Sequence, residues 1–431
     1  MPKQIAGSGI ELYDSSWFRR DDHRRRHCPA GLASEPRAAG SVSATRRLDS
    51  VNIVMLLGSG ASLDAGMPSV GEITLRVRTG DNVMATGSGW RAVDQLPPNH
   101  EIFNQELPGI VDFVQKLELL CDDYFRSQDK TRGTNYEDIA YVARQIEDGL
   151  TSEYENPALL PLNERLETVY GDELVRIAGA AADYIDDVVR SLLGRPAGPF
   201  DHLTALADAV RDEQVDQLTI ATLNHDVVLE HAFDLFNVQV SDGFDDPFGT
   251  LRVWNDRFSI PTRRLLKLHG SIDWWRYTLT RDGWTGQFTA RATDGDPEHA
   301  RGPANELLDY PALGRPLILT GTFNKILSYP TGIYADQHFR FHEALRDADV
   351  LLVIGYGFRD KAINARIVAW AERPGDRRLV VLHPDPVRLG QSARGAIRGK
   401  WRRWQDTGLL RFVPEYLSAE TNWATIRSSL D

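Results

Sequence analysis

A glycine-rich turn follows an apolar run near the start of the chain. The run covers residues 51–57, and it ends in the turn Gly58, Ser59, Gly60, Ala61 and Ser62. Backbone without side chains can approach a ligand closely, and a helix that begins at such a turn offers free N–H groups and a positive dipole end to a phosphate. This order predicts a phosphate or dinucleotide site. Glycine at a strand-to-helix turn also has purely steric uses, which remain the alternative.

A second polar group follows the β-rich segment 217–222. Thr222, Asn224 and Asp226 alternate along an extended stretch, so their side chains are expected to leave on one side. An amide beside a carboxylate can donate to a neutral polar ligand and accept from it at once. As an alternative, Asn224 or Asp226 caps a helix predicted over 227–236.

His269 stands at the end of the apolar run 264–268 and is followed by Gly270. An imidazole with a pKa near neutrality, beside a residue without a side chain, suits a general base that needs room for its substrate. The alternative is a core histidine satisfied by backbone. A Ser-His-Asp hydrolase lacks support, because no Gly-x-Ser-x-Gly elbow ends a strand.

A metal site is not expected. His338 and His342 are four residues apart on a predicted helix, but no Glu-rich or Cys-rich partner is placed to complete a site with them. Cys28 and Cys121 are the two cysteines, too few for a four-cysteine zinc module, and they fit a reducing cytosol.

Short apolar runs alternate with helical patterns over the last third of the chain. Strands are predicted at 264–268, 349–354 and 378–382, and helices at 336–346, 360–371 and 386–401. With the strands at 51–57 and 217–222, this alternation predicts an α/β fold. The expected architecture is a Rossmann-like doubly wound parallel sheet with the first strand near its centre. Because such sheets bind ligands beyond the carboxyl ends of their strands, the polar groups at these ends are expected to meet.

Composition and helical periodicity predict the domain organisation. Residues 1–48 are rich in Arg, Ser, Gly and Ala and are predicted to form a basic, disordered leader. Residues 49–415 are predicted to form the catalytic domain. Apolar spacings of three and four predict helices over 110–125, 135–150 and 172–193, so 100–195 is expected to be a helical insertion. A C-terminal helix is expected over 416–431.

Charge and hydropathy exclude several classes of protein. The formal net charge is −12, and residues 1–50 hold nine Lys/Arg against six Asp/Glu, which leaves −15 for the remainder. The body is therefore not expected to bind nucleic acid by bulk electrostatics. No run of 18 or more uncharged apolar residues is present, and the N-terminus lacks the apolar region of a signal peptide, so a cytoplasmic protein without membrane contact is expected.

Five short motifs, taken together and in order, resemble the sirtuin superfamily. They are GSGAS at 58–62, GMPS at 66–69, TLNHD at 222–226, KLHGS at 267–271 and IGYGF at 354–358. More closely, the sequence is similar to the zinc-free bacterial branch, the sirtuin-like NAD⁺-hydrolase subunits of antiphage defence systems. The resemblance spans residues 50 to 400, roughly.

The resemblance implies NAD⁺ as substrate and assigns roles by position. His269 matches the catalytic histidine, and Asn224 and Asp226 match the asparagine and aspartate of the nicotinamide-ribose pocket. The implied NAD⁺-binding residues are Gly58, Ser59, Gly60, Ala61, Ser62, Pro68, Thr222, Gly355, Gly357 and Asp385. Leu63 stands where the glycine fingerprint of hydride-transfer enzymes has glycine or alanine, which favours NAD⁺ as substrate over NAD⁺ as redox cofactor.

Departures from the family pattern bear on the reaction. Leu223 replaces the usual glutamine of deacylating sirtuins, and Val70 and Gly71 replace a Phe-Arg pair. We therefore expect an NAD⁺ glycohydrolase that gives nicotinamide and ADP-ribose and acts as the gated effector of an antiphage system. Homo-oligomerisation, or a partner such as a helicase-type ATPase or a short Argonaute, would supply the trigger. The alternatives are an NAD⁺-dependent deacylase or ADP-ribosyltransferase, and a non-catalytic NAD⁺- or ADP-ribose-binding scaffold or sensor.

Overall fold

The computed structural model describes most of the chain beyond residue 50. The described residues are 51–97, 104–127, 132–153, 156–244, 246–281, 284–293, 295–308, 311, 314–321 and 324–430. They all belong to one compact unit, Leu48–Asp431. The leader predicted over 1–48 lies outside the described residues.

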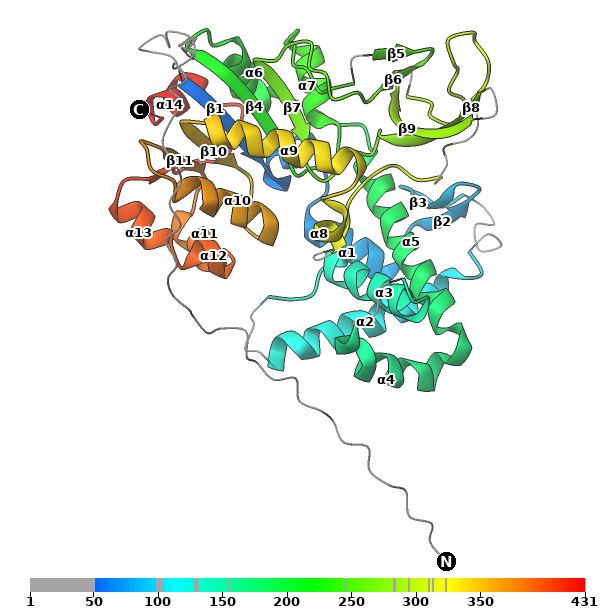
Figure 1. Cartoon of the computed structure of the whole chain (residues 1–431). Coiled ribbons are helices and arrows are strands. Elements are labelled where there is room, and N and C mark those ends of the chain that lie inside the picture. The colour runs from blue at the N-terminus through cyan, green and yellow to red at the C-terminus, as the bar shows by residue number, and fades with distance from the viewer. Residues whose placement is uncertain are drawn as a thin grey trace, which may run out of the picture. The chain divides into compact units, whose positions relative to one another are not determined.

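A six-stranded parallel sheet forms the centre of this unit (Figure 1). Its strand order is β12-β11-β10-β1-β4-β7. The strands are β1 (Val51–Leu57), β4 (Val215–Thr222), β7 (Arg263–Lys267), β10 (Val350–Ile354), β11 (Arg378–Leu382) and β12 (Leu410–Val413). The chain builds outward from β1 to β7, then crosses back and builds the other half from β10 to β12. The predicted doubly wound sheet with β1 at its centre is confirmed, and the strand order reverses between β1 and β10.

Successive residues of the central strands pack on opposite faces of the sheet, as the two-residue period of a strand requires. Ile53 and Met55 of β1 enter one core with α6 (Thr204–Arg211), α7 (Val228–Leu235) and α14 (Trp423–Ser428). Val54 and Leu56 enter the other core with α9 (Gly332–Asp347) and α10 (Lys361–Ala371). Helices therefore cover both faces, as expected of buried parallel strands.

The region 100–195 contains four α-helices within its described residues. They are α2 (Leu107–Ser127), α3 (Tyr136–Leu150), α4 (Leu160–Tyr170) and α5 (Leu174–Leu193). Helices α2, α3 and α5 pack against α1 (Val70–Thr79), and α4 contacts α5 (Figure 1). Their buried side chains join the same core as Ile53 and Met55 of the central sheet. The helices predicted here are present, but they share the core of the sheet. The domain boundaries themselves stay a prediction.

Two features of the C-terminal part differ from the sequence-based expectation. The single helix predicted over 386–401 is three short helices, α11 (Pro386–Ser392), α12 (Gly395–Arg398) and α13 (Trp401–Asp406), because the backbone is extended at Ala393. The helix predicted over 416–431 is confined to α14. Strand β12 was not predicted at all, because its four residues are too few to show a clear period.

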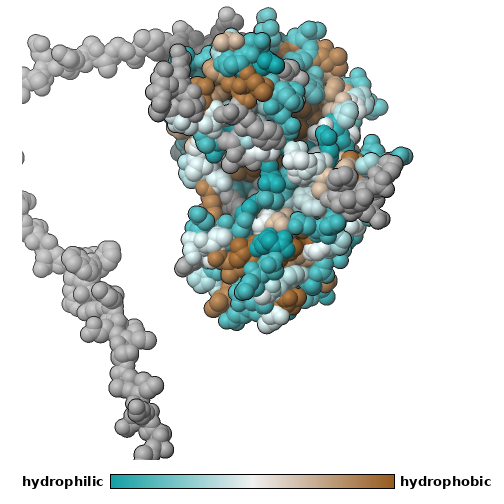
Figure 2. All heavy atoms as spheres, turned by 90° about the vertical axis from the view of Figure 1, so that its right-hand side faces the viewer, coloured by the Kyte–Doolittle hydropathy of each residue, from teal (hydrophilic) through white to brown (hydrophobic). Residues whose placement is uncertain are grey.

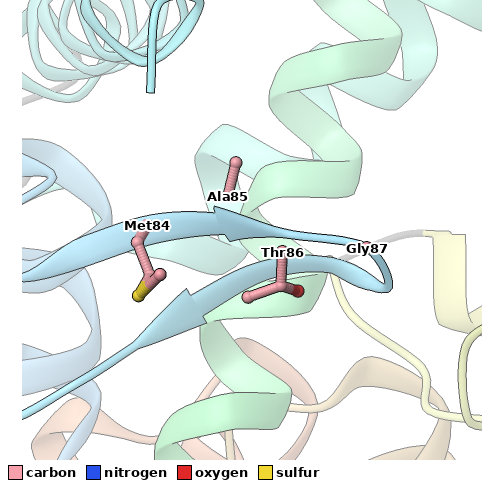
Figure 3. A pocket seen from close by; sticks show the side chains of 4 residues that line it. All are labelled: Met84, Ala85, Thr86 and Gly87. Atoms are coloured by element: carbon pink, nitrogen blue, oxygen red, sulfur yellow. The ribbon is translucent and has the colours of Figure 1, made fainter. Parts of the chain in front are cut away.

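Two small antiparallel β structures lie outside the central sheet. One is the hairpin of β2 (Val83–Thr86) and β3 (Gly89–Ala92). Met84, Ala85, Thr86 and Gly87 of this hairpin line a surface pocket, which Figure 3 shows. The other is a four-stranded sheet of order β5-β6-β9-β8. Its strands are β5 (Asp246–Phe248), β6 (Leu251–Val253), β8 (Trp275–Arg281) and β9 (Trp284–Ala292). Neither was predicted from the sequence.

The surface on the side of these two β structures is mixed in character. Figure 2 shows hydrophilic and hydrophobic residues interspersed on that face. Among the described helices, none combines the length and the apolar character that crossing a membrane requires.

Candidate active site at the switch point

The carboxyl ends of the central strands lie side by side. Leu57 at the end of β1 is opposite Thr222 of β4 and Ile354 of β10, and Lys267 of β7 is opposite Thr222. Backbone hydrogen bonds continue past the strands, from Gly58 N to Ile354 O at 3.0 Å. The polar groups that the sequence places after these strands are thus brought to one edge of the sheet, at the point where strand order reverses.

The glycines of the first turn contact the loop that follows β10. A Cβ on Gly58 would lie 2.6 Å from Gly355 O, and a Cβ on Gly60 would lie 2.8 Å from Gly355 Cα. Gly60 N donates a hydrogen bond to Gly355 O at 3.1 Å. This backbone-to-backbone packing accounts for Gly58 and Gly60 without a ligand, which is the steric use of glycine that the sequence left open. The exposed side chain of Ser59 is the part of the turn that faces outward.

The prediction of a helix directly after this turn is wrong. Two 3₁₀ turns, Ser59–Ala61 and Leu63–Ala65, follow instead, and α1 begins only at Val70. The side chain of Ser69 accepts a hydrogen bond from Glu72 N, and the Glu72 carboxylate accepts one from Ser69 N. The N–H group of Glu72, in the first turn of α1, is therefore satisfied by a capping box within the chain itself. Pro68 is buried directly before this cap.

Ser62 joins the turn to the polar segment after β4. Asn224 Nδ2 donates to Ser62 Oγ at 2.9 Å and to Gly58 O at 3.1 Å, and Ser62 Oγ donates to Asp226 Oδ1 at 3.2 Å. Thr222 Oγ1 accepts from Asn224 N at 3.1 Å. Asn224 and Asp226 do leave on one side, and Ser62 is where they meet. Asn224 Oδ1 and Asp226 Oδ2 have no hydrogen-bond partner among the described residues.

Asp226 has a structural role as well. Its Oδ1 atom accepts from Val228 N, at the first residue of α7, at 3.1 Å, although the N-cap residue of that helix is Val227. Below it, the buried Lys267 Nζ donates to the Asp226 carbonyl and lies 2.8 Å from Glu230 Oε1. The ion pair between Lys267 and Glu230 thus helps to fix the segment that carries Asn224 and Asp226.

His269 is buried, with 3% of its surface exposed, and its ring is held by two side chains from distant segments. Nε2 lies 2.8 Å from Tyr329 Oη and 3.4 Å from Asp360 Oδ2, and Tyr329 Oη donates to Asp360 Oδ2 at 2.9 Å. Gly270 does not leave room for a substrate as the sequence suggested. Its φ is +81°, and a Cβ there would overlap the Leu317 carbonyl.

Burial and neighbouring charges act together on these groups. Burial lowers the pKa of His269, the positive charge of Lys325 lowers it further, and Asp360 opposes both. Burial alone would raise the pKa of Asp360, but hydrogen bonding and charge from His269 hold it well below its usual value. Burial, and then the charge of Asp360, raise the pKa of Tyr329 far above its ordinary range. Asp360 is therefore a carboxylate and Tyr329 a neutral phenol at neutral pH.

Tyr329 and Asp360 were not predicted from the sequence as residues of the site. Asp360 follows the Gly355-Tyr356-Gly357 segment at the start of the helix predicted over 360–371, a position typical of an ordinary N-cap. Tyr329 lies 60 residues from His269 in a stretch without a clear period. The Tyr356 hydroxyl, which accepts from Asp360 N at 3.1 Å and donates to Asn364 Oδ1 at 3.0 Å, fixes the loop that presents Asp360.

Other candidate residues stand apart from this cluster. Asp385 is exposed after β11, where Oδ1 caps α11 through Arg388 N at 2.9 Å. His338 is buried with its ring centroid 3.8 Å from that of Tyr329, and burial lowers its pKa to about 3, whereas His342 is exposed. Within the described ranges, no three or more His, Cys, Asp or Glu side chains group as metal ligands would.

Residues 218–406 match the family model described as the SIR2-like domain. The matched segment runs from β4 into α13 and includes Asn224, Asp226, His269 and Asp360. Over this segment, which is less than half of the chain, the sequence is similar to the SIR2-like domain. A comparison with curated proteins gave no match.

Solved structures with some likeness to the chain are Sir2 proteins. A mutant Sir2 homologue in complex with ADP-ribose is 15% identical, with 83% of this chain and 90% of that chain covered and a TM-score of 0.32. A Sir2 homologue in complex with NAD is 13% identical, with 88% and 90% covered and a TM-score of 0.36. Scores this low carry no weight for function, and the fold stands on the sheet topology described above.

Proposed function

We propose that this chain is an NAD⁺ glycohydrolase that releases nicotinamide and ADP-ribose at the switch point of its sheet. The observation that carries the proposal is the convergence there of the Ser62, Asn224 and Asp226 network with a buried His269 held by a carboxylate. NAD⁺ would lie along the ends of β1, β4 and β10. Gly58 to Ser62, Pro68 and Thr222 would line one half, and Gly355, Gly357 and Asp385 the adenosine half.

The chemistry required is cleavage of a glycosidic C–N bond. The bond breaks through an oxocarbenium-like state, so the protein must orient the leaving group and bring up water. Asn224 Oδ1 and Asp226 Oδ2, which have no protein partner among the described residues, would hold nicotinamide and its ribose. His269 would accept a proton from the attacking water or a ribose hydroxyl. Water adds to C1′, nicotinamide leaves with the bonding electron pair, and one proton is released.

Gating by assembly in the cytoplasm is part of the same proposal, because constant NAD⁺ loss would harm the cell that makes the enzyme. Large apolar side chains are exposed on neighbouring helices of the 100–195 region, Leu119 and Tyr124 on α2, and Leu160 and Val169 on α4. Phe113 of α2 packs edge-on against Tyr170 of α4, so the two helices are adjacent. This surface supports contacts with a second copy of the chain or with a partner of an antiphage system.

The direct test is product analysis with the purified full chain. We expect NAD⁺ to give equal amounts of nicotinamide and ADP-ribose, and Asn224→Ala and His269→Ala to lower the rate by about 100-fold or more. His342→Ala, at an exposed histidine, is the matched control and should keep the wild-type rate. Circular dichroism checks that the variants are folded. Full turnover by His269→Ala would remove its assigned role, and O-acetyl-ADP-ribose formed with an acetyl-lysine peptide would indicate deacylation instead.

A further inference from the structure

The Asp360 carboxylate is fixed in position at the start of α10. Its Oδ1 atom accepts hydrogen bonds from Ala362 N at 2.8 Å and Ile363 N at 2.9 Å, the ordinary contacts of a helix N-cap. Oδ2 takes no part in the cap. It is directed at Tyr329 and His269. Helix capping therefore explains one oxygen of this carboxylate and leaves the other unexplained.

The three groups around Oδ2 determine where the protons are. Asp360 is ionised and can only accept, so the Tyr329 hydroxyl must give it its single proton. The Tyr329 oxygen then accepts from His269 Nε2, which lies 2.8 Å away and must carry a hydrogen. The neutral imidazole is thus the Nε2–H tautomer. Its basic nitrogen is Nδ1.

We infer that Asp360 is the positioning residue of His269, acting directly and through the Tyr329 hydroxyl. It holds the Nε2–H tautomer, leaves Nδ1 as the atom that accepts the proton, and balances the positive charge of the imidazolium that results. This inference rests on the proposed function for the base role of His269. The arrangement follows the general rule that a buried carboxylate orients one nitrogen of a catalytic imidazole so that the other can act.

Other charged and titratable groups face His269 from several elements. Lys325 of α8 (Asn324–Ser328) is paired with Glu137 of α3 at 2.8 Å, and its positive charge disfavours the imidazolium. His225 after β4 and His338 of α9 are buried nearby, and burial lowers the pKa of each. Among the described residues, Asp360 is the carboxylate in direct contact with the ring. Its hydrogen bond and charge, followed by the more distant charge of Glu137, oppose the effects of burial and Lys325 on the pKa of His269.

Asp360→Asn tests this role, because asparagine caps a helix about as well as aspartate but carries no charge. We expect kcat for NAD⁺ to fall by about 100-fold, with KM changed by less than about 3-fold and thermal stability near wild type. The limb of the pH profile that reports protonation of the base should move to lower pH, because loss of Asp360 lowers the pKa of His269. In Tyr329→Phe, which keeps the aromatic ring, we expect kcat to fall by about 10-fold.

Asp256→Asn is the matched control. Asp256 is a half-buried carboxylate paired with Arg340 at 2.6 Å, and its positive φ of 57° is one that asparagine also tolerates. We expect wild-type kcat and an unchanged pH profile. An unchanged kcat and pH profile in Asp360→Asn would overturn the inference. Turnover by Tyr329→Phe above the wild-type rate would also overturn it, since Tyr329 would then be a block on His269.

A second readout separates this inference from the proposed function. Nitrogen-15 NMR of histidine-labelled full chain, with His269 assigned by its loss in His269→Gln, reports the tautomer and pKa of the ring without any turnover. We expect the Nε2–H tautomer in the wild type, and a lower pKa with mixed tautomers in Asp360→Asn. The Nδ1–H tautomer in the wild type would overturn the inference. A chain that consumes no NAD⁺ but shows the expected NMR behaviour would contradict the proposed function alone.

Discussion

At the scale of single residues, Ser62 is the junction between the first turn and the segment after β4. Ser62→Ala removes the bond to Asp226 Oδ1 and the acceptor for Asn224 Nδ2. We expect a loss of stability of about 1–2 kcal/mol and at least about 10-fold slower NAD⁺ turnover, because both side chains that we propose to hold NAD⁺ lose a partner. Ser191→Ala, whose hydroxyl contacts both the N–H and the carbonyl of Ala92, is the matched control. Denaturant unfolding should show a comparable loss there, without a change in turnover; equal turnover in both variants would contradict the role of Ser62.

At the scale of elements, α5 is tied to the segment 314–321 by two acidic residues, the buried Asp187 and the partly buried Asp186. Burial raises the pKa of Asp186 to about 6, against the hydrogen bond from Thr320 and the charge of Arg144. A raised carboxyl pKa favours the fold below the unfolded value and loses that contribution as pH rises through 6. Asp186→Asn, which still accepts from Thr320, should therefore gain stability relative to wild type between pH 4 and 7, on the order of 3 kcal/mol. Unfolding curves of both proteins across this range check it, and a constant difference would refute it.

At the scale of the whole molecule, the compact unit Leu48–Asp431 contains every residue of the candidate site. The sheet that positions the site combines β1, from near the start of the unit, with β12, from near its end, so a truncation before Leu410 would remove a strand of this sheet. We expect deletion of residues 1–47 to leave the melting temperature unchanged and kcat within about 2-fold of the full chain, because every residue of the candidate site belongs to the unit Leu48–Asp431. Calorimetry and NAD⁺ turnover measure this. A fall in kcat with unchanged melting would assign the leader a functional role.

Much of the site could be located from the sequence because parallel strands place their carboxyl ends at one edge. The predicted strands at 51–57, 217–222, 264–268, 349–354 and 378–382 are all present to within two residues. The polar groups after the first four of these strands meet as expected, whereas Asp385 after β11 stands apart. Local patterns could not predict the small β structures or the segmented helices after β11. The late start of α1 at Val70 was missed although a proline and a capping box, both local signals, set that boundary.

By itself, the amino-acid sequence determined the class of fold, since short apolar runs and helical periods encode local structure and strand direction. It also determined which strand ends carry amide, carboxylate and imidazole groups. Only the tertiary structure decided what those groups contact. Ser62 meets Asp226 across 164 residues, and His269 meets Tyr329 across 60. Such contacts depend on how the crossover connections bring segments that are distant in sequence together. The local hydrophobic period of a segment contains no information about which distant segment it will contact.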